Sequence, residues 1–73
     1  MENSKLKTME QMRQVAEQGI ELSSKEMKQI AYNNGITDER VMRTFWNYMS
    51  ECNKLAEIIR GEWNEYNSTL QPL

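Results

Sequence analysis

The sequence has no histidine, and only one cysteine and one proline among its 73 residues. Cys52 cannot form a disulfide within the chain, and a single thiolate without histidine is too little for a zinc site. The chain also lacks a glycine-rich phosphate loop and a serine nucleophile elbow. We therefore expect no enzyme activity, no metal and no cofactor, and we interpret Cys52 as a small core residue.

Long apolar runs are absent as well. No segment approaches the roughly 18 apolar residues that are needed to cross a bilayer, and residues 1–7 lack the apolar centre of a signal peptide. A free cysteine without an export signal fits a reducing compartment. The expectation is a cytoplasmic protein that does not engage a membrane.

A cationic surplus is also missing, because 9 basic residues stand against 11 acidic ones and the net charge is −2. A nucleic-acid-binding domain usually concentrates lysine and arginine on one face. Here the two signs are mixed along the whole chain. The charge pattern therefore disfavours nucleic acid as the partner.

What the sequence does contain is apolar residues at helical spacing, without the alternation that is typical of strands. A first helix is expected over about residues 4–18, with Gly19 as a weak point or end. A second is expected over about residues 24–34, because Ser23 and Glu26 have the spacing of a capping box and Gly35 follows as a left-handed cap. Residues 1–73 thus form a single all-α domain, a helical hairpin followed by a long C-terminal helix.

The third helix has the strongest pattern and is expected over residues 38–60 or longer, with Thr37 as its cap. Gly61 leaves open whether it continues, and residues 70–73 are expected to fray. Apolar residues at steps of three and four form one stripe along it: Val41, Phe45, Tyr48, Cys52, Leu55, Ile59, Trp63, Tyr66 and Leu70.

A second apolar strip, formed by Met42, Trp46 and Met49, lies beside the first half of that stripe. We therefore expect the two short helices to pack on the first half of the third helix. Its second half then either meets the first helix or projects to meet another chain, as a dimerising arm does. A chain of this size buries only about 60% of its unfolded surface, so self-association, as a dimer, is expected.

The favoured function is that of a small regulatory protein, an adaptor or inhibitor, that binds and occludes a partner protein. Compact chains of this kind are often encoded by phages or mobile elements. Tryptophan is enriched at binding hot spots, and each indole here fits a core or a contact equally well. The candidate partner surface comprises Met42, Trp46, Met49, Trp63 and Tyr66.

Two alternatives remain. The spacing of Ala31, Gly35 and Val41 resembles that of a helix-turn-helix DNA-binding motif, although a plain helical corner needs the same residues and is favoured by the charge pattern. The resemblance covers residues 27–41 and implies DNA binding through residues 27–47. A third function is a helical oligomer that sequesters a small anionic ligand. The candidate DNA or anion contacts are Arg40, Arg43, Thr44, Asn47 and Arg60.

Overall fold

The computed structural model describes the backbone of residues 2–70 and the side chains of residues 3–62. Three helices make up the fold: α1 spans Glu2–Glu17, α2 spans Ser24–Asn33 and α3 spans Glu39–Leu70. No strand occurs within residues 2–70. The predicted all-α, three-helix class is confirmed.

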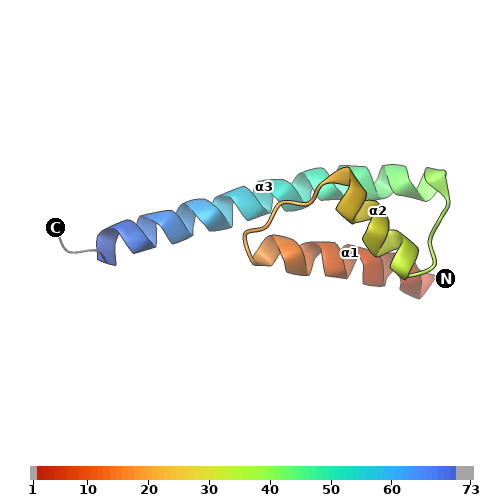
Figure 1. Cartoon of the computed structure of the whole chain (residues 1–73), viewed down its shortest axis with the longest axis horizontal. Helices are drawn as coiled ribbons and strands as arrows, with labels where there is room; N and C mark the ends of the chain where they lie inside the picture. Colours follow the sequence, from red (N-terminus) through yellow and green to blue (C-terminus); the bar gives the residue numbers. More distant parts are fainter. Residues whose placement is uncertain (1, 71–73) are drawn as a thin grey trace.

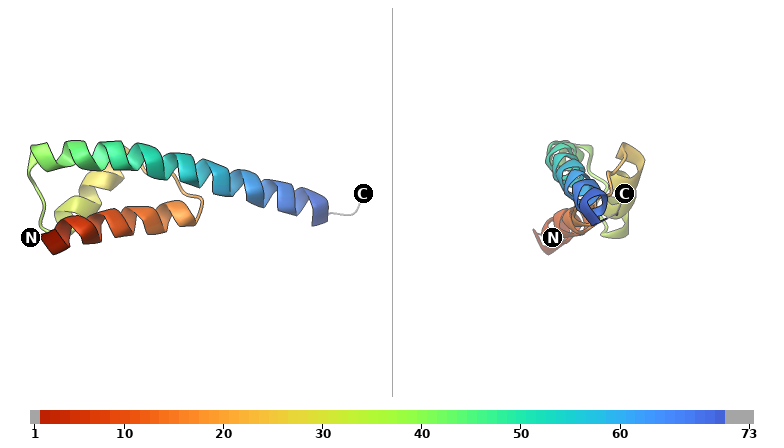
Figure 2. Two further views of the ribbon diagram at one scale, coloured as in Figure 1. Left: turned by 180° about the vertical axis from the view of Figure 1, so that it is seen from behind. Right: turned by 90° about the vertical axis from the view of Figure 1, so that its left-hand side faces the viewer.

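The helices differ in length and direction. α1 and α3 lie side by side and run the same way, while α2 returns across them (Figure 1). Seen from the end, α2 lies on one side of the α1–α3 pair and leaves the opposite side of the pair uncovered (Figure 2). α3 continues well past the end of α1, so the molecule is elongated.

Gly19 ends α1, as the sequence predicts. Its φ of 76° is in the left-handed region, where only glycine is free of strain. The Gly19 N–H donates to the Ala16 carbonyl at 2.8 Å and the Ile20 N–H donates to the Val15 carbonyl at 3.3 Å, which is the bond pattern of a Schellman motif. A Cβ at Gly19 would lie 3.3 Å from Cγ of Arg60, so this turn also packs closely on α3.

Both ends of α2 follow the local sequence signals. The Ser23 hydroxyl accepts from the Glu26 N–H at 3.3 Å, and the Ser23 N–H donates to the Glu26 carboxylate at 3.3 Å. This confirms the capping box. Gly35 has a φ of 81°, and the Ile36 N–H donates back to the Ala31 carbonyl at 2.9 Å. The predicted left-handed end of α2 is therefore confirmed too.

The cap of α3 was expected at Thr37, and that prediction is wrong. The Asp38 carboxylate accepts from the Arg40 N–H at 2.8 Å, and the Asp38 carbonyl accepts the first backbone bond of the helix. Aspartate is at least as good an N-cap as threonine, and its charge also suits the positive end of the helix dipole. At the other end α3 passes through Gly61, because one glycine costs only about 1 kcal/mol within a helix.

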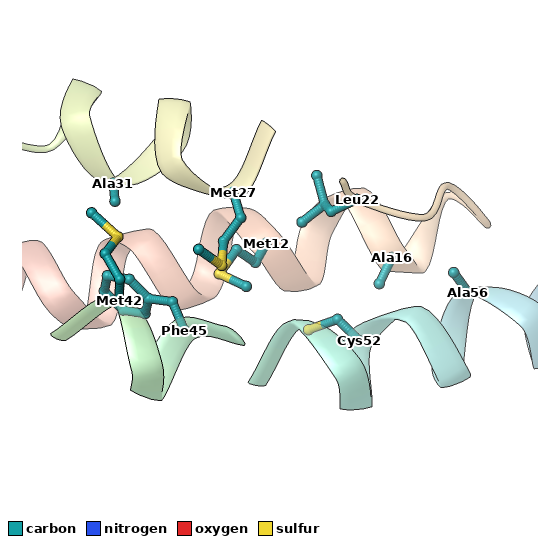
Figure 3. Close-up of a cluster of buried hydrophobic side chains, with 9 residues drawn as sticks. All are labelled: Met12, Ala16, Leu22, Met27, Ala31, Met42, Phe45, Cys52 and Ala56. Atoms are coloured by element: carbon teal, nitrogen blue, oxygen red, sulfur yellow. The ribbon is translucent and has the colours of Figure 1, made fainter. Parts of the chain in front are cut away.

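The core lies where the three helices meet. Met12 of α1 and Met27 of α2 point toward one another, and Met42 lies beside Phe45 on α3 (Figure 3). These four side chains are fully buried and form the centre of the core. The remaining core residues are small or lie toward the far end of α1: Ala16, Leu22, Ala31, Cys52 and Ala56.

The buried face of α3 is rotated from the stripe expected from the sequence. Phe45 and Cys52 are buried as expected, whereas Val41, Tyr48 and Leu55 are only half-buried. Met42 of the second strip is fully buried, while Trp46 and Met49 are half-buried on the side where α2 packs. The observed seam of α3 consists of Met42, Phe45, Met49, Cys52, Ala56 and Ile59.

Two asparagines fix the loops to the helices. Asn34 Nδ2 lies within hydrogen-bonding distance of Thr8 Oγ1 at 3.0 Å and of Gln11 Oε1 at 2.9 Å, and ties the end of α2 to α1. Asn53 accepts from the Leu22 N–H at 2.8 Å and donates to the Leu22 carbonyl at 3.0 Å, which ties the α1–α2 loop to α3. The sequence analysis gave neither residue a structural role across helices.

Candidate functional site

Within residues 3–62, no three cysteine, aspartate or glutamate side chains come close enough to hold a metal ion. Among the described residues, no helix is both long enough and apolar enough to cross a membrane. The surfaces of the helices are therefore the features to compare.

The first half of the expected partner surface is closed by α2. Met42 is fully buried, so its assignment to a contact surface is wrong; it fills the core between α2 and α3. Trp46 and Met49 are half-buried and pack against that core. Lys28 of α2 places its ammonium 5.3 Å from the centroid of the Trp46 ring, a cation–π contact that covers one face of the indole.

The second half of the expected surface falls at the end of α3. Trp63 and Tyr66 belong to the helix by backbone, but their side chains lie outside the described residues. Their positions along the chain are still informative. The seam of α3 advances by steps of three and four from Met42 to Ile59, and the next members of that series are residues 63, 66 and 70.

The arginine face of α3 is fully open. Arg40, Arg43, Thr44 and Asn47 are all exposed, and they lie on the side of the helix that faces away from the core. The first two border a shallow hollow of about 470 Å³ together with Glu39, whose carboxylate opposes anion binding. The structure thus brings these candidate contacts together.

Arg60 is separate from that group. Its guanidinium forms an ion pair with Glu21 of the α1–α2 loop at 3.4 Å. It therefore faces the loop, several turns further along α3 than Arg40 and Arg43. The three arginines do not form one anion site within this chain.

Two hollows that were not expected from the sequence lie beside α1 and α3. One, of about 140 Å³, lies beside Tyr48 and Leu55 of α3 and Arg13 of α1. The other, of about 450 Å³, lies at the corner between α2 and α3, where residues 35–38 line it together with Val41 and Lys5. The signal was present in the sequence, since Val41, Tyr48 and Leu55 repeat every two turns of a helix.

The most distinctive surface is the part of α3 that no other helix covers. Ala56 is buried and Ile59 is half-buried, and the turn at Gly19 lies against Ile59 and Arg60. The covering helices end at this point, whereas α3 continues to Leu70 without α1 or α2 beside it (Figures 1 and 2). We call residues 61–70 the arm and residues 2–60 the head.

No family model, curated protein or solved structure matches the chain. The argument for function therefore depends on these surfaces and on the chemistry of their residues.

Cys52 and Tyr48 form the one pair of neighbouring groups in residues 3–62 with clearly shifted pKa values. Burial raises the pKa of the Cys52 thiol above its ordinary value of 9.0. Burial, together with the nearby Cys52, raises the pKa of Tyr48 above 10.0. Both groups are protonated at neutral pH, so Cys52 is a core residue and not a reactive thiolate.

These shifts predict a loss of stability in alkali. A group whose pKa is raised in the folded state contributes stability below its unfolded pKa and loses that contribution as the pH rises through the folded value. The free energy of unfolding should therefore stay level to about pH 8 and fall as the pH passes 9.0 and 10.0. Urea unfolding followed by circular dichroism measures it, and Tyr48→Phe should show a smaller alkaline loss. Equal losses in both proteins would contradict the role of Tyr48.

Proposed function

We propose that the protein is a small, non-enzymatic interaction protein that binds and occludes a partner protein, as an adaptor or inhibitor. The observation that supports this is the uncovered arm of α3. Most helical stability in proteins comes from packing of an apolar face, so an arm that neither α1 nor α2 covers gains stability when another surface packs on it. Trp63, Tyr66 and Leu70 continue the seam spacing along the arm.

The composition of the arm indicates the kind of surface it binds. Residues 61–70 contain Glu62 and Glu65 but no lysine or arginine. Tryptophan and tyrosine are enriched among the residues that dominate binding energy. The complementary surface is an apolar groove with a basic border, which an amphipathic helix fills with residues at steps of three and four.

Substitution of the arm should separate binding from folding. Trp63→Ala or Tyr66→Ala is expected to weaken capture of the partner by about 30-fold, the effect of losing a hot-spot side chain of about 2 kcal/mol. Tagged protein would be used to capture partners from its native lysate after nuclease treatment, with the far-ultraviolet circular dichroism spectrum recorded for each variant.

Two control variants sharpen this measurement. Asn64→Ala changes the arm at an uncharged position outside the seam series and should capture as well as the parent protein. Trp46→Ala removes an indole that packs on the core and on Lys28, so it should lower stability more than capture. Capture that is unchanged by Trp63→Ala and Tyr66→Ala would overturn the proposal.

One observation favours a second function, DNA binding through residues 27–47. Arg40, Arg43 and Asn47 share an exposed face at the start of α3, next to the corner closed by Gly35. Binding of this kind depends steeply on salt because it releases counterions. A low-salt gel shift that is lost with Arg40→Ala and Arg43→Ala would support it, and no shift on fragments of the gene's own locus would end it.

A further inference from the structure

We propose that the arm also binds a second copy of this chain, with the two arms antiparallel about a twofold axis. The inference rests on the proposed function, because the same arm serves both: a partner protein binds by replacing the second copy. Self-pairing then keeps the arm covered while the partner is absent.

The seam spacing of α3 continues from the head into the arm. In the head, the seam of α3 is buried under α1 and α2, with Met42, Phe45 and Ala56 fully buried. The same series of three and four runs on through residues 63, 66 and 70 without a break in the helix. This is the spacing at which one helix packs along another. In this chain α1 is the helix that packs there, and it ends near Ile59.

The side of α3 on which α1 and α2 pack favours antiparallel arms. In each copy, α1 and α2 lie on the seam face of α3, because the seam residues are the ones that these two helices bury. Parallel pairing would bring two heads to the same end, each in the path of the other copy. Antiparallel pairing places the heads at opposite ends, and the seam faces of the two arms can meet between them. An isologous pair about a twofold axis is also the commonest form of dimer.

The point where the α1 cover ends limits the register of the two arms. The cover supplied by α1 ends where Gly19 packs against Ile59, so the helix of a second copy can reach that point and no further. Placing Leu70 of the second copy opposite Ile59 also places position 66 of the second copy opposite position 63. A register one heptad deeper would drive the second helix into α1. A register one heptad shallower would lose these pairs.

The surroundings of this register are compatible with pairing. Ile20, 48% exposed just after the end of α1, offers an apolar contact to the last turn of the second copy. Positions that flank the seam bring Glu62 near Thr69 of the second copy and Arg60 near Asn67 of the second copy, so no like charges are opposed. Two short helices bury less than a standard interface of about 1,600 Å², which makes the dimer weak enough to exchange with a partner.

The oligomeric state tests the pairing. Sedimentation equilibrium over a roughly hundredfold range of concentration should show a reversible change from 8.7 kDa to twice that mass. Tyr66→Ala with Leu70→Ala should raise the dissociation constant about tenfold or more, whereas Glu65→Ala should leave it unchanged. A parent protein that stays monomeric throughout would overturn the inference.

Cysteine cross-linking tests the direction. Because Cys52 is buried, disulfides formed under mild oxidation come from cysteines introduced on the arm and not from Cys52. A mixture of Glu62→Cys and Thr69→Cys proteins should form the mixed disulfide under mild oxidation, and each variant alone should cross-link much more slowly. Rapid cross-linking of Thr69→Cys with itself indicates parallel arms and contradicts the register.

The two proposals fail in different ways. A monomeric protein whose capture of a partner depends on Trp63 would refute self-pairing and leave the proposed function standing. A dimer with the predicted cross-link that captures no partner would do the reverse. If both proposals hold, partner binding lowers the dimer fraction.

Discussion

Replacing Phe45 by alanine is expected to lower the free energy of unfolding by about 3–5 kcal/mol, the range for large aromatic side chains in cores. Phe45 is fully buried beside Met12, Met27 and Met42, and it is the largest of the fully buried side chains. A domain of this size has a total stability of about 4–11 kcal/mol. The loss is therefore a large part of the total, and the Phe45→Ala protein should unfold at a much lower urea concentration than the parent protein.

Urea unfolding monitored by circular dichroism measures this effect, with the midpoint and slope compared between variants. Tyr32→Ala is the matched control, because Tyr32 is also aromatic but is 44% exposed. It should change stability by less than about 1 kcal/mol. Phe45→Leu should fall between the two because leucine refills part of the volume with apolar atoms. A Phe45→Ala protein as stable as Tyr32→Ala would show that the core does not form as described.

The features that the sequence predicted best are those decided by a few adjacent residues. The capping box of Ser23 and Glu26 and the glycine ends at Gly19 and Gly35 depend on local backbone geometry and local hydrogen bonds. The cap of α3 was missed by one residue because Thr37 and Asp38 are both good caps. Local signals thus define where helices end, with an uncertainty wherever two capping residues adjoin.

The face of α3 that is buried could not be read from the sequence alone. Two apolar series run along the helix, and Val41, Tyr48 and Leu55 fit the helical period as well as Met42, Met49 and Ala56 do. The choice between them depends on the side from which α2 approaches, which is a long-range property. For the same reason Met42 was wrongly assigned to a contact surface, although it lies at the centre of the core.

The candidate surfaces also divide into features set by local helical period and features set by long-range packing. Exposure of Arg40, Arg43 and Asn47 follows from helical period once the buried face is known. The extent of the arm depends instead on where α1 ends against α3, which the contact of Gly19 with Ile59 decides. The sequence analysis left open whether the second half of α3 meets α1. The contact of Gly19 places that boundary near residue 60.

Long-range polar contacts were the least predictable, and Asn53 is the clearest case. Its amide forms two hydrogen bonds to the backbone of Leu22, 31 residues away in the sequence. Asn53→Ala removes both and leaves the N–H and carbonyl of the nearly buried Leu22 without these partners. Because an unpaired buried group costs about 1–3 kcal/mol, we expect a loss of about 2–4 kcal/mol, measured by urea unfolding.

Asn53→Asp distinguishes the effect of losing a hydrogen bond from the effect of losing side-chain volume, because aspartate and asparagine have nearly the same size. The new carboxylate can still accept from the Leu22 N–H, but its second oxygen faces the Leu22 carbonyl, where Nδ2 of asparagine now donates. This raises the pKa of the aspartate in the folded state, so its destabilising effect is small below the unfolded pKa of about 3.9 and grows as the pH rises through the folded value. Relative to the parent protein, the variant should therefore be more stable at about pH 4 than at about pH 7. An Asn53→Asp protein that gains stability toward neutral pH, or an Asn53→Ala protein within about 0.5 kcal/mol of the parent, would show that this contact does not hold the α1–α2 loop on α3.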